Sequence, residues 1–513
     1  MVVAIVASAS DRLDTLTSWH ADWRGLRTVV YGLGVTGFAA ADTLAELGVE
    51  VLVVAGSASA ERTRMLQVIG ARLAETADQE EIPEELKQFD PELVIVSPGY
   101  HPDHPLVVWA QRHGIPVWGD IELAWRLRDK IIRAQEGPAK WILVTGTNGK
   151  TTTVHLTAAM LAAAGHAVAP CGNIGVPVLD AIRDPNGFDV LVVELSSYQL
   201  HWLTDRPAGA LVPYASACLN IAQDHIDWHG SFRAYRDAKA KVYQGTTIAC
   251  VYNRADPETE SMVREADVVE GARAIGFGLQ PPRSGDVGLV DEILCDRAFI
   301  AERATSALEF GTVSDLRERG LGAPHVIANI LAATALARSF GAPVAAIRSA
   351  LETFRLDAHR IEPVGSAAGI RWIDDSKATN PHAAQASLRA FDSVVWLVGG
   401  LLKGVEIDDL IRGNVDRLRA AVVIGVDRAE LLAAFSRHAP KLPVYQVEAD
   451  ETSQIMPEAV RLASAVAQDG DVVLLAPAAA SMDQFTDYAQ RGRLFAAAVQ
   501  DILGGEADGQ SAS

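Results

Sequence analysis

WILVTGTNGKTTT, at residues 141–153, is the stretch that decides the fold. Trp141 to Val144 has the pattern of a buried strand, and a glycine turn follows it and opens a helix at about Thr151. Such a turn points several backbone N–H groups at one place, and the helix dipole adds to them, so it can bind a polyphosphate. The pattern predicts ATP as the ligand, with Lys150 against its phosphates and the Thr151 hydroxyl on Mg²⁺.

The motif differs from the common phosphate loop at one position. Val144 stands where the first glycine is expected, so we predict a tighter loop opened by Gly146. An ordinary strand-to-helix turn is the alternative, but Gly-Lys-Thr directly after a glycine loop favours phosphate binding.

Length and composition are those of a multi-domain globular protein. The chain has 513 residues, 49% of them hydrophobic and 21% charged. This length predicts about three or four domains. The formal net charge of −20 argues against a nucleic-acid partner and against an anionic membrane surface.

The sequence also predicts a compartment. No apolar run approaches the ~18 residues that span a bilayer, and the first ten residues lack the basic segment of a signal peptide. The four cysteines lack paired metal spacing and suit free thiols: Cys171, Cys218, Cys250 and Cys295. We expect a cytoplasmic protein without membrane insertion.

The first 118 residues resemble a small α/β domain. A strand over 28–31 enters the glycine turn 32–37, and a helix is predicted over 38–47. This is the dinucleotide fingerprint by pattern, but the next strand, 51–54, ends in Ala-Gly-Ser without the carboxylate that binds a ribose. We favour another diphosphate at this turn, with NAD or a purely structural turn as alternatives. The strand 93–96 brings Gly99 to the same edge.

A hinge is predicted near Gly119, before a helical stretch over 121–133. Beyond the phosphate loop, an apolar strand over 189–193 ends in Glu194, a candidate Mg²⁺ ligand; a carboxylate that faces water is the alternative. Asn173 lies in a glycine-flanked turn that could line the same cleft or cap a helix.

Two further side chains have open interpretations. His225 could bind a metal through a neutral ring nitrogen, or it could be a structural hydrogen-bonding group beside aspartates. Lys239 lies in a predicted helix over 235–243, where lysines usually form a solvated face.

Read together, the motifs resemble those of the Mur ligase family. GTNGKTT at 146–152 is typical of the whole family. The narrower resemblance, to its D-glutamate-adding members, comes from ELSSYQL at 194–200, DDSKATN at 374–380, and SMDQF at 481–485 followed by QRG at 490–492. The resemblance covers nearly the whole chain.

The resemblance implies an α/β fold of three domains. These are an N-terminal Rossmann-like UDP-binding domain over 1–118, a central P-loop ATPase-like domain with a parallel sheet over 119–357, and a C-terminal Rossmann-like domain for the amino acid over 358–513. We expect residues 504–513 to be disordered, because they are small and polar. Residues 278–310 are expected to be a surface excursion.

The implied activity is that of an ATP-dependent ligase. It adds D-glutamate to UDP-N-acetylmuramoyl-L-alanine through an acyl phosphate, in peptidoglycan precursor synthesis for the cell wall. Such an enzyme acts on small molecules and is expected to be a monomer. The alternatives are another Mur-type ligase with a different amino acid, a nicotinamide-dependent oxidoreductase, and a non-catalytic ATP-binding regulator.

The resemblance also implies roles for individual residues. Catalysis is implied for Lys150, Glu194, His225 and Lys239. ATP binding is implied for Gly146, Thr147, Asn148, Gly149, Lys150, Thr151, Thr152, Asn329, Arg360, Asp375 and Lys377. UDP-substrate binding is implied for Gly34, Val35, Thr36, Gly99, Asn173, Ser197 and Gln199. D-Glutamate binding is implied for His359, Thr379, Lys403, Ser481 and Tyr488.

Two Mg²⁺ ions are implied as well. Their implied ligands are Thr151, Glu194, His225 and Lys239, the last as a carbamate that turns the cation into a carboxylate-like group. The family's His-Asn-x-x-Asn motif matches at His325 and Asn329, whereas Val326 stands at the position of its first asparagine.

Overall fold

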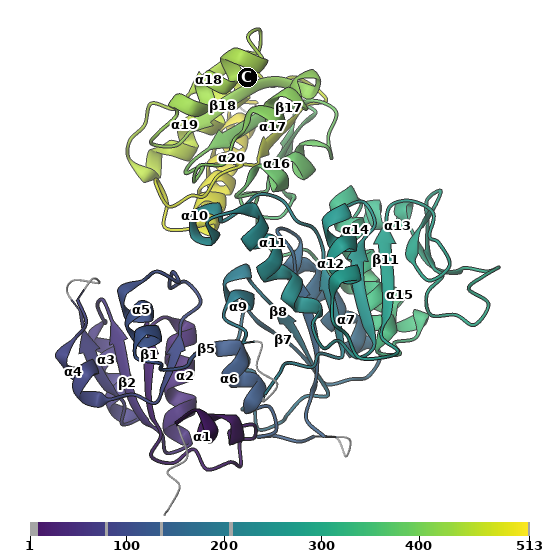
Figure 1. Cartoon of the computed structure of the whole chain (residues 1–513). Coiled ribbons are helices and arrows are strands. Elements are labelled where there is room, and N and C mark those ends of the chain that lie inside the picture. The colour runs from purple at the N-terminus through teal and green to yellow at the C-terminus, as the bar shows by residue number, and fades with distance from the viewer. Residues whose placement is uncertain (1–8, 77–80, 134–136, 205–208, 511–513) are drawn as a thin grey trace, which may run out of the picture. The chain divides into compact units, whose positions relative to one another are not determined.

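The computed structural model describes residues 9–76, 81–133, 137–204 and 209–510. Its chain forms two compact units. The first comprises Met1–Ile221, Arg233–Val313 and Ala328–Phe354, and the second comprises Ala222–Phe232, Ser314–Ile327 and Arg355–Ser513. The first unit contains two sheets and the second contains one (Figure 1). The two boundaries that we expect near residues 118 and 357 stay predictions.

The first sheet is parallel throughout, in the order β3-β2-β1-β4-β5. The order reverses beside β1, so the Gly32 turn at its carboxyl end lies at the switch point where open α/β sheets bind ligands. The strands are β1 (Arg27–Tyr31), β2 (Glu50–Ala55), β3 (Arg72–Glu75), β4 (Leu93–Val96) and β5 (Val117–Gly119). The helices are α1 (Ala9–Thr15), α2 (Val35–Glu46), α3 (Ala60–Val68), α4 (Glu84–Phe89), α5 (Pro105–Arg112) and α6 (Asp120–Arg126).

The second sheet has nine strands in the order β14-β13-β12-β11-β10-β9-β6-β8-β7. They are β6 (Lys140–Thr145), β7 (Val168–Gly172), β8 (Val190–Glu194), β9 (Ala215–Cys218), β10 (Ala249–Asn253), β11 (Arg273–Gly278), β12 (Val287–Val290), β13 (Ile293–Asp296) and β14 (Leu308–Thr312). Because β6 lies between β8 and β9, the phosphate loop that leaves it is flanked by the ends of both neighbours.

In the described chain, nine helices lie between β6 and β15 in the sequence. They are α7 (Lys150–Ala163), α8 (Val178–Ala181), α9 (Ser197–His201), α10 (Ile226–His229), α11 (Phe232–Ala240), α12 (Pro257–Glu265), α13 (Val313–Glu318), α14 (Pro324–Ser339) and α15 (Val344–Thr353), with a 3₁₀ turn η1 (Lys241–Tyr243) after α11. The strand and helix predicted around the phosphate loop are therefore confirmed.

Two predictions for this part were wrong. Residues 278–310 are not a surface excursion: β12 and β13 form a hairpin around Asp291, which has φ +53°, and β14 pairs with β13, so the sheet is not wholly parallel. Val287 and Phe310 are buried there. The helix predicted over 121–133 ends at Arg126, where the Arg128 guanidinium donates to the Trp125 carbonyl and satisfies one of the end carbonyls.

The third sheet has the order β15-β16-β20-β17-β18-β19 and is parallel except for the β15–β16 pair. Its strands are β15 (Glu362–Ala367), β16 (Ile370–Asp374), β17 (Val394–Gly399), β18 (Leu418–Ile424), β19 (Val444–Gln446) and β20 (Val472–Leu475). Its helices are α16 (Pro381–Leu388), α17 (Asp408–Arg412), α18 (Ala429–His438), α19 (Thr452–Ser464) and α20 (Tyr488–Gln510), with a 3₁₀ turn η2 (Val415–Arg417).

The disorder that we expect for residues 504–513 stays a prediction, and α20 has bounds that extend to Gln510. Val499 and Leu503 of this helix lie against Gly365, and this packing stabilises the helix up to Gly504. Residues 511–513 lie outside the described residues.

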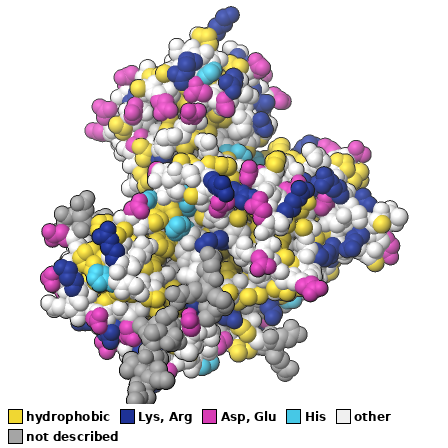
Figure 2. Space-filling view, viewed as in Figure 1, with side chains coloured by type: hydrophobic (Ala, Val, Ile, Leu, Met, Phe, Trp, Pro, Cys, Tyr) yellow, Lys and Arg dark blue, Asp and Glu magenta, His cyan; other side chains and the backbone are white. Residues whose placement is uncertain are grey.

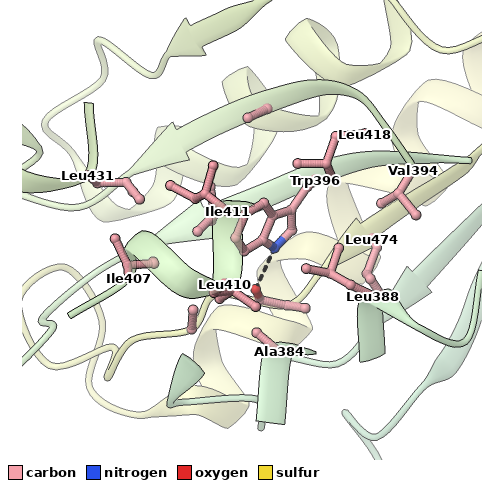
Figure 3. Packing of buried hydrophobic residues seen from close by; sticks show 14 of the residues in the cluster. Ala384, Leu388, Val394, Trp396, Ile407, Leu410, Ile411, Leu418, Leu431 and Leu474 are labelled. Atoms are coloured by element: carbon pink, nitrogen blue, oxygen red, sulfur yellow. Dashed lines mark hydrogen bonds between the residues drawn. The ribbon is translucent and has the colours of Figure 1, made fainter. Parts of the chain in front are cut away.

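Trp396 lies at the centre of one core of this sheet (Figure 3). Its ring is fully buried among side chains from α16, α17, β18 and β20, and its Nε1–H donates to the Ala476 carbonyl at 2.7 Å. The core therefore holds β17 against the segment that follows β20, and both of these strands lead into loops with predicted site residues.

On the face shown in Figure 2, acidic and basic side chains are interspersed. None of the helices in the described part of the chain has both the length and the apolar stretch that a bilayer crossing requires. The four cysteines are free and buried.

Candidate active site

The phosphate loop is a tight glycine turn, as predicted. Gly146 has φ +149° and Gly149 has φ +84°, conformations that favour glycine. A Cβ on Gly149 would lie 2.4 Å from Asn329 Oδ1, so the side chain of Asn329 in α14 packs directly on the loop. The Lys150 ammonium folds over this turn and donates to the Gly146 and Thr147 carbonyls at 2.9 Å each. Its charge is thereby placed above the N-terminus of α7.

Asn220 holds this loop from the neighbouring strand β9. Its Oδ1 accepts the Asn148 N–H at 2.9 Å, its Nδ2 donates to the Asn148 carbonyl at 3.0 Å, and its own carbonyl accepts the Thr147 N–H at 2.9 Å. Sequence reasoning gave Asn220 no role. The sequence could have indicated this role, because Asn220 lies just beyond the end of a strand that flanks the loop.

Lys239 is 2% exposed, so the solvated lysine face is excluded at this position. Its ammonium donates to the Gly146 carbonyl at 2.9 Å and to Thr145 Oγ1 at 3.3 Å, and it lies 5.0 Å from the centre of the Tyr235 ring. Tyr235 in turn hydrogen-bonds to Thr147 Oγ1 at 2.8 Å. The structure therefore brings both predicted catalytic lysines to the same loop carbonyl.

Glu194 ends β8 beside the loop and is 2% exposed, which excludes a carboxylate that faces water. Its Oε1 accepts from Asn173 Nδ2 at 3.0 Å. In the part of the chain that the structure describes, its buried Oε2 has no hydrogen-bond partner. A carboxylate with one unsatisfied oxygen next to a phosphate loop suits a hard cation, so these residues fit Mg²⁺. Thr151, whose hydroxyl is another predicted ligand in this unit, is buried at the start of α7.

Gln199 links the central sheet to the first one. Ser196 and Gln199 form a capping box at the start of α9, and Gln199 Nε2 donates to Asp120 Oδ2 at 2.9 Å. Asp120 is fully buried at the start of α6, and burial raises its pKa to about 6. Ser197 is also buried. The predicted UDP-substrate residues of this region therefore lie where the first sheet meets the central one.

The Gly32 turn of the first sheet holds the other predicted UDP-substrate residues. A Cβ on Gly37 would lie 2.1 Å from the Gly32 carbonyl oxygen, so glycine permits α2 to pack on β1. Arg62 of α3 donates to the Leu33 and Gly34 carbonyls at 2.9 Å each, a contact that the sequence did not suggest. The residues at the mouth of this turn are Gly34, Val35, Thr36 and, after β4, Gly99.

In the second unit, His359 and Asp374 form a buried pair. His359 Nδ1 lies 2.7 Å from Asp374 Oδ2, and Asp374 Oδ1 accepts the Ser376 N–H at 2.8 Å. Burial raises the pKa of Asp374, and the hydrogen bonds from His359 and Ser376 act in the opposite direction. Gly492 of α20 makes room for the pair, since a Cβ there would lie 2.2 Å from His359 Nδ1.

Asp375 and Lys377 follow directly. Asp375 accepts from the Ser387 hydroxyl and, at 3.3 Å, from the Ile361 N–H, and burial raises its pKa to about 6. The Lys377 ammonium lies 5.1 Å from the centre of the Tyr488 ring. Both predicted ATP-binding residues thus follow the end of β16, within the second unit, and the Lys377 ammonium lies near Tyr488 at the start of α20.

The two loops predicted to hold D-glutamate are joined by their backbones. Leu401 and Ala480 form an antiparallel bridge, with N–H···O distances of 2.9 and 3.1 Å. Lys403, two residues after the bridge, is exposed with φ +56°, and Ser481 follows the other side of the bridge. The Ala478 N–H donates to the Ala378 carbonyl at 2.9 Å, beside Thr379. The structure therefore brings Thr379, Lys403 and Ser481 to one edge of the sheet.

Arg491 connects two segments at this edge, the one that follows β16 and the one that follows β20. It is fully buried, and its guanidinium donates to Ser376 Oγ at 2.9 Å, to the Ser376 carbonyl at 2.8 Å and to the Ala479 carbonyl at 3.2 Å. Burial lowers its pKa to about 10. The QRG motif marked this residue in the sequence, but no role was assigned.

Three further residues that the sequence analysis singled out lie in the second unit: His225, His325 and Arg360. His225 has φ +54° and its Nε2 lies 3.6 Å from Asp224 Oδ2. Burial lowers the pKa of His325 to about 4, and the charge of Arg360 acts in the same direction. Because His225 belongs to a different unit from Glu194 and Lys239, its part in a shared metal site stays a prediction.

Fold and site together define a class of protein. It is a multi-domain α/β protein with a glycine loop of the phosphate-binding type on one sheet and, on another, an edge that gathers the residues predicted to bind the amino acid. The profile of the Mur ligase middle domain matches residues 144–337, and that of the Mur ligase, glutamate ligase domain matches residues 359–479. The chain belongs to the Mur ligase family.

Relatives extend this result along the whole chain. The UDP-N-acetylmuramoylalanine–D-glutamate ligase of Leifsonia xyli subsp. xyli is 66% identical over 99% of both chains. The enzyme of the same name from Streptomyces avermitilis is 49% identical over 94% of this chain and 99% of its own.

Solved structures show the same fold. UDP-N-acetylmuramate-alanine ligase MurC from Thermotoga maritima is 20% identical, with a TM-score of 0.54 over 92% of this chain and 99% of that chain. A pseudomurein peptide ligase type C from Methanothermus fervidus is 15% identical, with a TM-score of 0.55 over 93% of this chain and 99% of that chain.

Proposed function

We propose that this protein is an ATP-dependent ligase that joins D-glutamate to UDP-N-acetylmuramoyl-L-alanine in peptidoglycan precursor synthesis. The observation that carries the proposal is the 66% identity, over 99% of the chain, to an enzyme of that name. The geometry supports it, because the phosphate loop, the carboxylate of Glu194 and the bridged loops of Lys403 and Ser481 are the parts that such a reaction needs.

The reaction has two steps. The carboxylate of the muramoyl-alanine nucleotide first takes the γ-phosphoryl group of ATP, because an oxide ion is too poor a leaving group for direct amide formation. The amine of D-glutamate then attacks the acyl phosphate and phosphate leaves. Lys150 and the N–H groups of its loop neutralise charge in the first step. Closure around the substrates excludes water from the acyl phosphate.

The proposed ATP contacts continue beyond the loop. Asn329 packs on Gly149 and is assigned to the nucleotide, together with Arg360, Asp375 and Lys377. When bound, Mg²⁺ ions supply positive charge that the phosphates need as they transfer. We assign Thr151 and Glu194 as ligands, with His225 and a carbamylated Lys239 completing a two-ion arrangement.

Carbamylation of Lys239 needs a neutral amine and CO₂, and the buried contacts of its nitrogen with the loop provide a site sheltered from water. A ¹³C carbamate signal in bicarbonate-equilibrated enzyme, absent in Lys239→Ala, is the expected result. A fully active Lys239→Ala enzyme would contradict the assignment.

The remaining assignments concern the other substrates and the setting. The UDP-linked substrate is assigned to the Gly32 turn with Gly99, and further to Asn173, Ser197 and Gln199. D-Glutamate is assigned to Thr379, Lys403, Ser481, His359 and Tyr488. We propose a monomer that works in the cytoplasm, where its substrates are small molecules.

One coupled assay tests the function. Purified protein with ATP and Mg²⁺ should release ADP when it is given both UDP-N-acetylmuramoyl-L-alanine and D-glutamate, and Lys150→Ala should release none. L-Alanine, L-glutamate or diaminopimelate in place of D-glutamate should give little amide product. Release of ADP with another amino acid and not with D-glutamate would assign the chain to a different branch of the family.

A further inference from the structure

His359 has the surroundings of a general base rather than of a simple binding group. Its Nδ1 lies 2.7 Å from Asp374 Oδ2, and Asp374 is fully buried and held by the Ser376 N–H. A buried carboxylate that accepts from Nδ1–H fixes the neutral ring in the tautomer whose lone pair is on Nε2. Within the described chain, Nε2 hydrogen-bonds to no other group and is not among the fully buried polar atoms.

The ring is held in place from several sides. The backbone of His359 has φ +64°, a strained conformation for a non-glycine residue, and its N–H donates to Glu362 Oε2 at 2.7 Å. The Tyr488 ring lies edge-on at 6.4 Å, and only a glycine at 492 leaves space for Nδ1. These contacts hold the His359 side chain in one orientation, as functional side chains require.

Three elements, β15, β16 and α20, place charged or titratable groups around the His359 ring. Asp374 is on β16, Glu362 on β15 lies 4.0 Å from Nδ1, and Tyr488 is on α20. Lys377 donates its backbone N–H to the His359 carbonyl at 3.3 Å, and Arg360 is the next residue along the chain. Two carboxylates therefore lie on the Nδ1 side of the ring.

We propose that His359 is the general base that deprotonates the ammonium group of the incoming amino acid, with Asp374 as the positioning residue that orients the ring. This rests on the proposed function. The ammonium loses one proton to Nε2, and the lone pair of the resulting amine forms the C–N bond. The C–O bond to phosphate breaks, and the second N–H proton leaves with the phosphate as HPO₄²⁻. Solvent then takes the proton from the imidazolium. The location agrees with this step, since Thr379 lies in the segment that follows β16 and Tyr488 begins α20. The Ala478 N–H, two residues before the bridged Ala480, donates to the Ala378 carbonyl beside Thr379.

The test measures two steps separately in the His359→Gln variant: formation of the acyl phosphate and attack by the amine of D-glutamate. Hydroxylamine is largely unprotonated at neutral pH, so it can trap the acyl phosphate as a hydroxamate without a base. We expect His359→Gln to form the hydroxamate from ATP and UDP-N-acetylmuramoyl-L-alanine within about threefold of the wild-type rate. Its kcat for D-glutamate should fall by ~10²–10⁴-fold, the range of general-base catalysis. That kcat should recover as pH rises, because solution then supplies free amine.

Two variants complete the design. Asp374→Asn keeps the size of the side chain but loses the tautomer control, so it should also lose kcat with D-glutamate and keep hydroxamate formation. His438→Gln is the matched control, because His438 also pairs with a carboxylate, Asp408 at 2.6 Å, in the same unit, and neither residue belongs to the predicted site. It should leave both rates unchanged.

The outcomes are distinct. An equal loss of hydroxamate and amide formation in His359→Gln, or a rise in KM for D-glutamate at unchanged kcat, would overturn the assignment of a base. If the wild-type protein makes neither product, the proposed function itself fails.

Discussion

At the scale of single residues, burial changes the acid strength of Asp120. Burial raises its pKa to about 6 from an ordinary value of 3.8, although Gln199 donates to it. The folded chain therefore keeps this proton to a higher pH than the unfolded chain does. Stability from this group is present below about pH 4 and is lost as pH rises through about 6.

Asp120→Asn should remove this dependence. Asparagine can still accept from Gln199 Nε2, and it carries no charge to bury. The free energy of unfolding of the variant, relative to wild type, should increase by ~1–3 kcal/mol from acid to neutral pH, as urea denaturation at a series of pH values would measure. Asp103→Asn is the control, because that carboxylate is 90% exposed. A difference that stays constant across the pH range would contradict the prediction.

At the scale of elements, the phosphate loop depends on its neighbour β9. Asn220 makes two side-chain hydrogen bonds to the backbone of Asn148 and fixes the direction of the loop N–H groups. Asn220→Ala should therefore loosen the loop. We expect KM for ATP to rise by about 5- to 30-fold, as the loss of two hydrogen bonds of ~1 kcal/mol each implies, with KM for D-glutamate unchanged.

Steady-state kinetics with each substrate varied in turn would measure this effect. Asn186→Ala is a suitable control, since Asn186 is exposed and, among the residues that the structure describes, hydrogen-bonds only to Asp184. Equal rises in KM for both substrates would instead indicate general loss of structure.

Local patterns predicted the elements well and long-range contacts poorly. The strand before Gly146 and the carboxylate of Glu194 were found because each is read from adjacent residues. The links of Asn220 and Arg491 were missed, since their partners lie 72 and 115 residues away in the chain. The β12–β13 hairpin was missed because its strands are only four residues long and follow a Pro-Gly-rich segment.

At the scale of the whole molecule, the two compact units should unfold separately. The second unit has its own core on each face of its sheet. Trp396→Phe leaves the Ala476 carbonyl unsatisfied in one of these cores, which should cost ~1–3 kcal/mol and lower one calorimetric transition by about 2–4 °C per kcal/mol.

Trp141→Phe is the matched substitution in the first unit. Trp141 is equally buried, but its Nε1 has no hydrogen-bond partner in the described chain, so only packing is lost. We expect it to lower the other transition, and by less. If both substitutions shift one common transition, the units do not unfold independently.

The bridge between Leu401 and Ala480 has a practical consequence for redesign. Because these two loops share backbone hydrogen bonds, a change in one displaces the other. An attempt to alter amino-acid preference by transplanting a single loop from a relative would leave its counterpart mismatched. Both segments have to be exchanged as a set, taken from the same donor sequence.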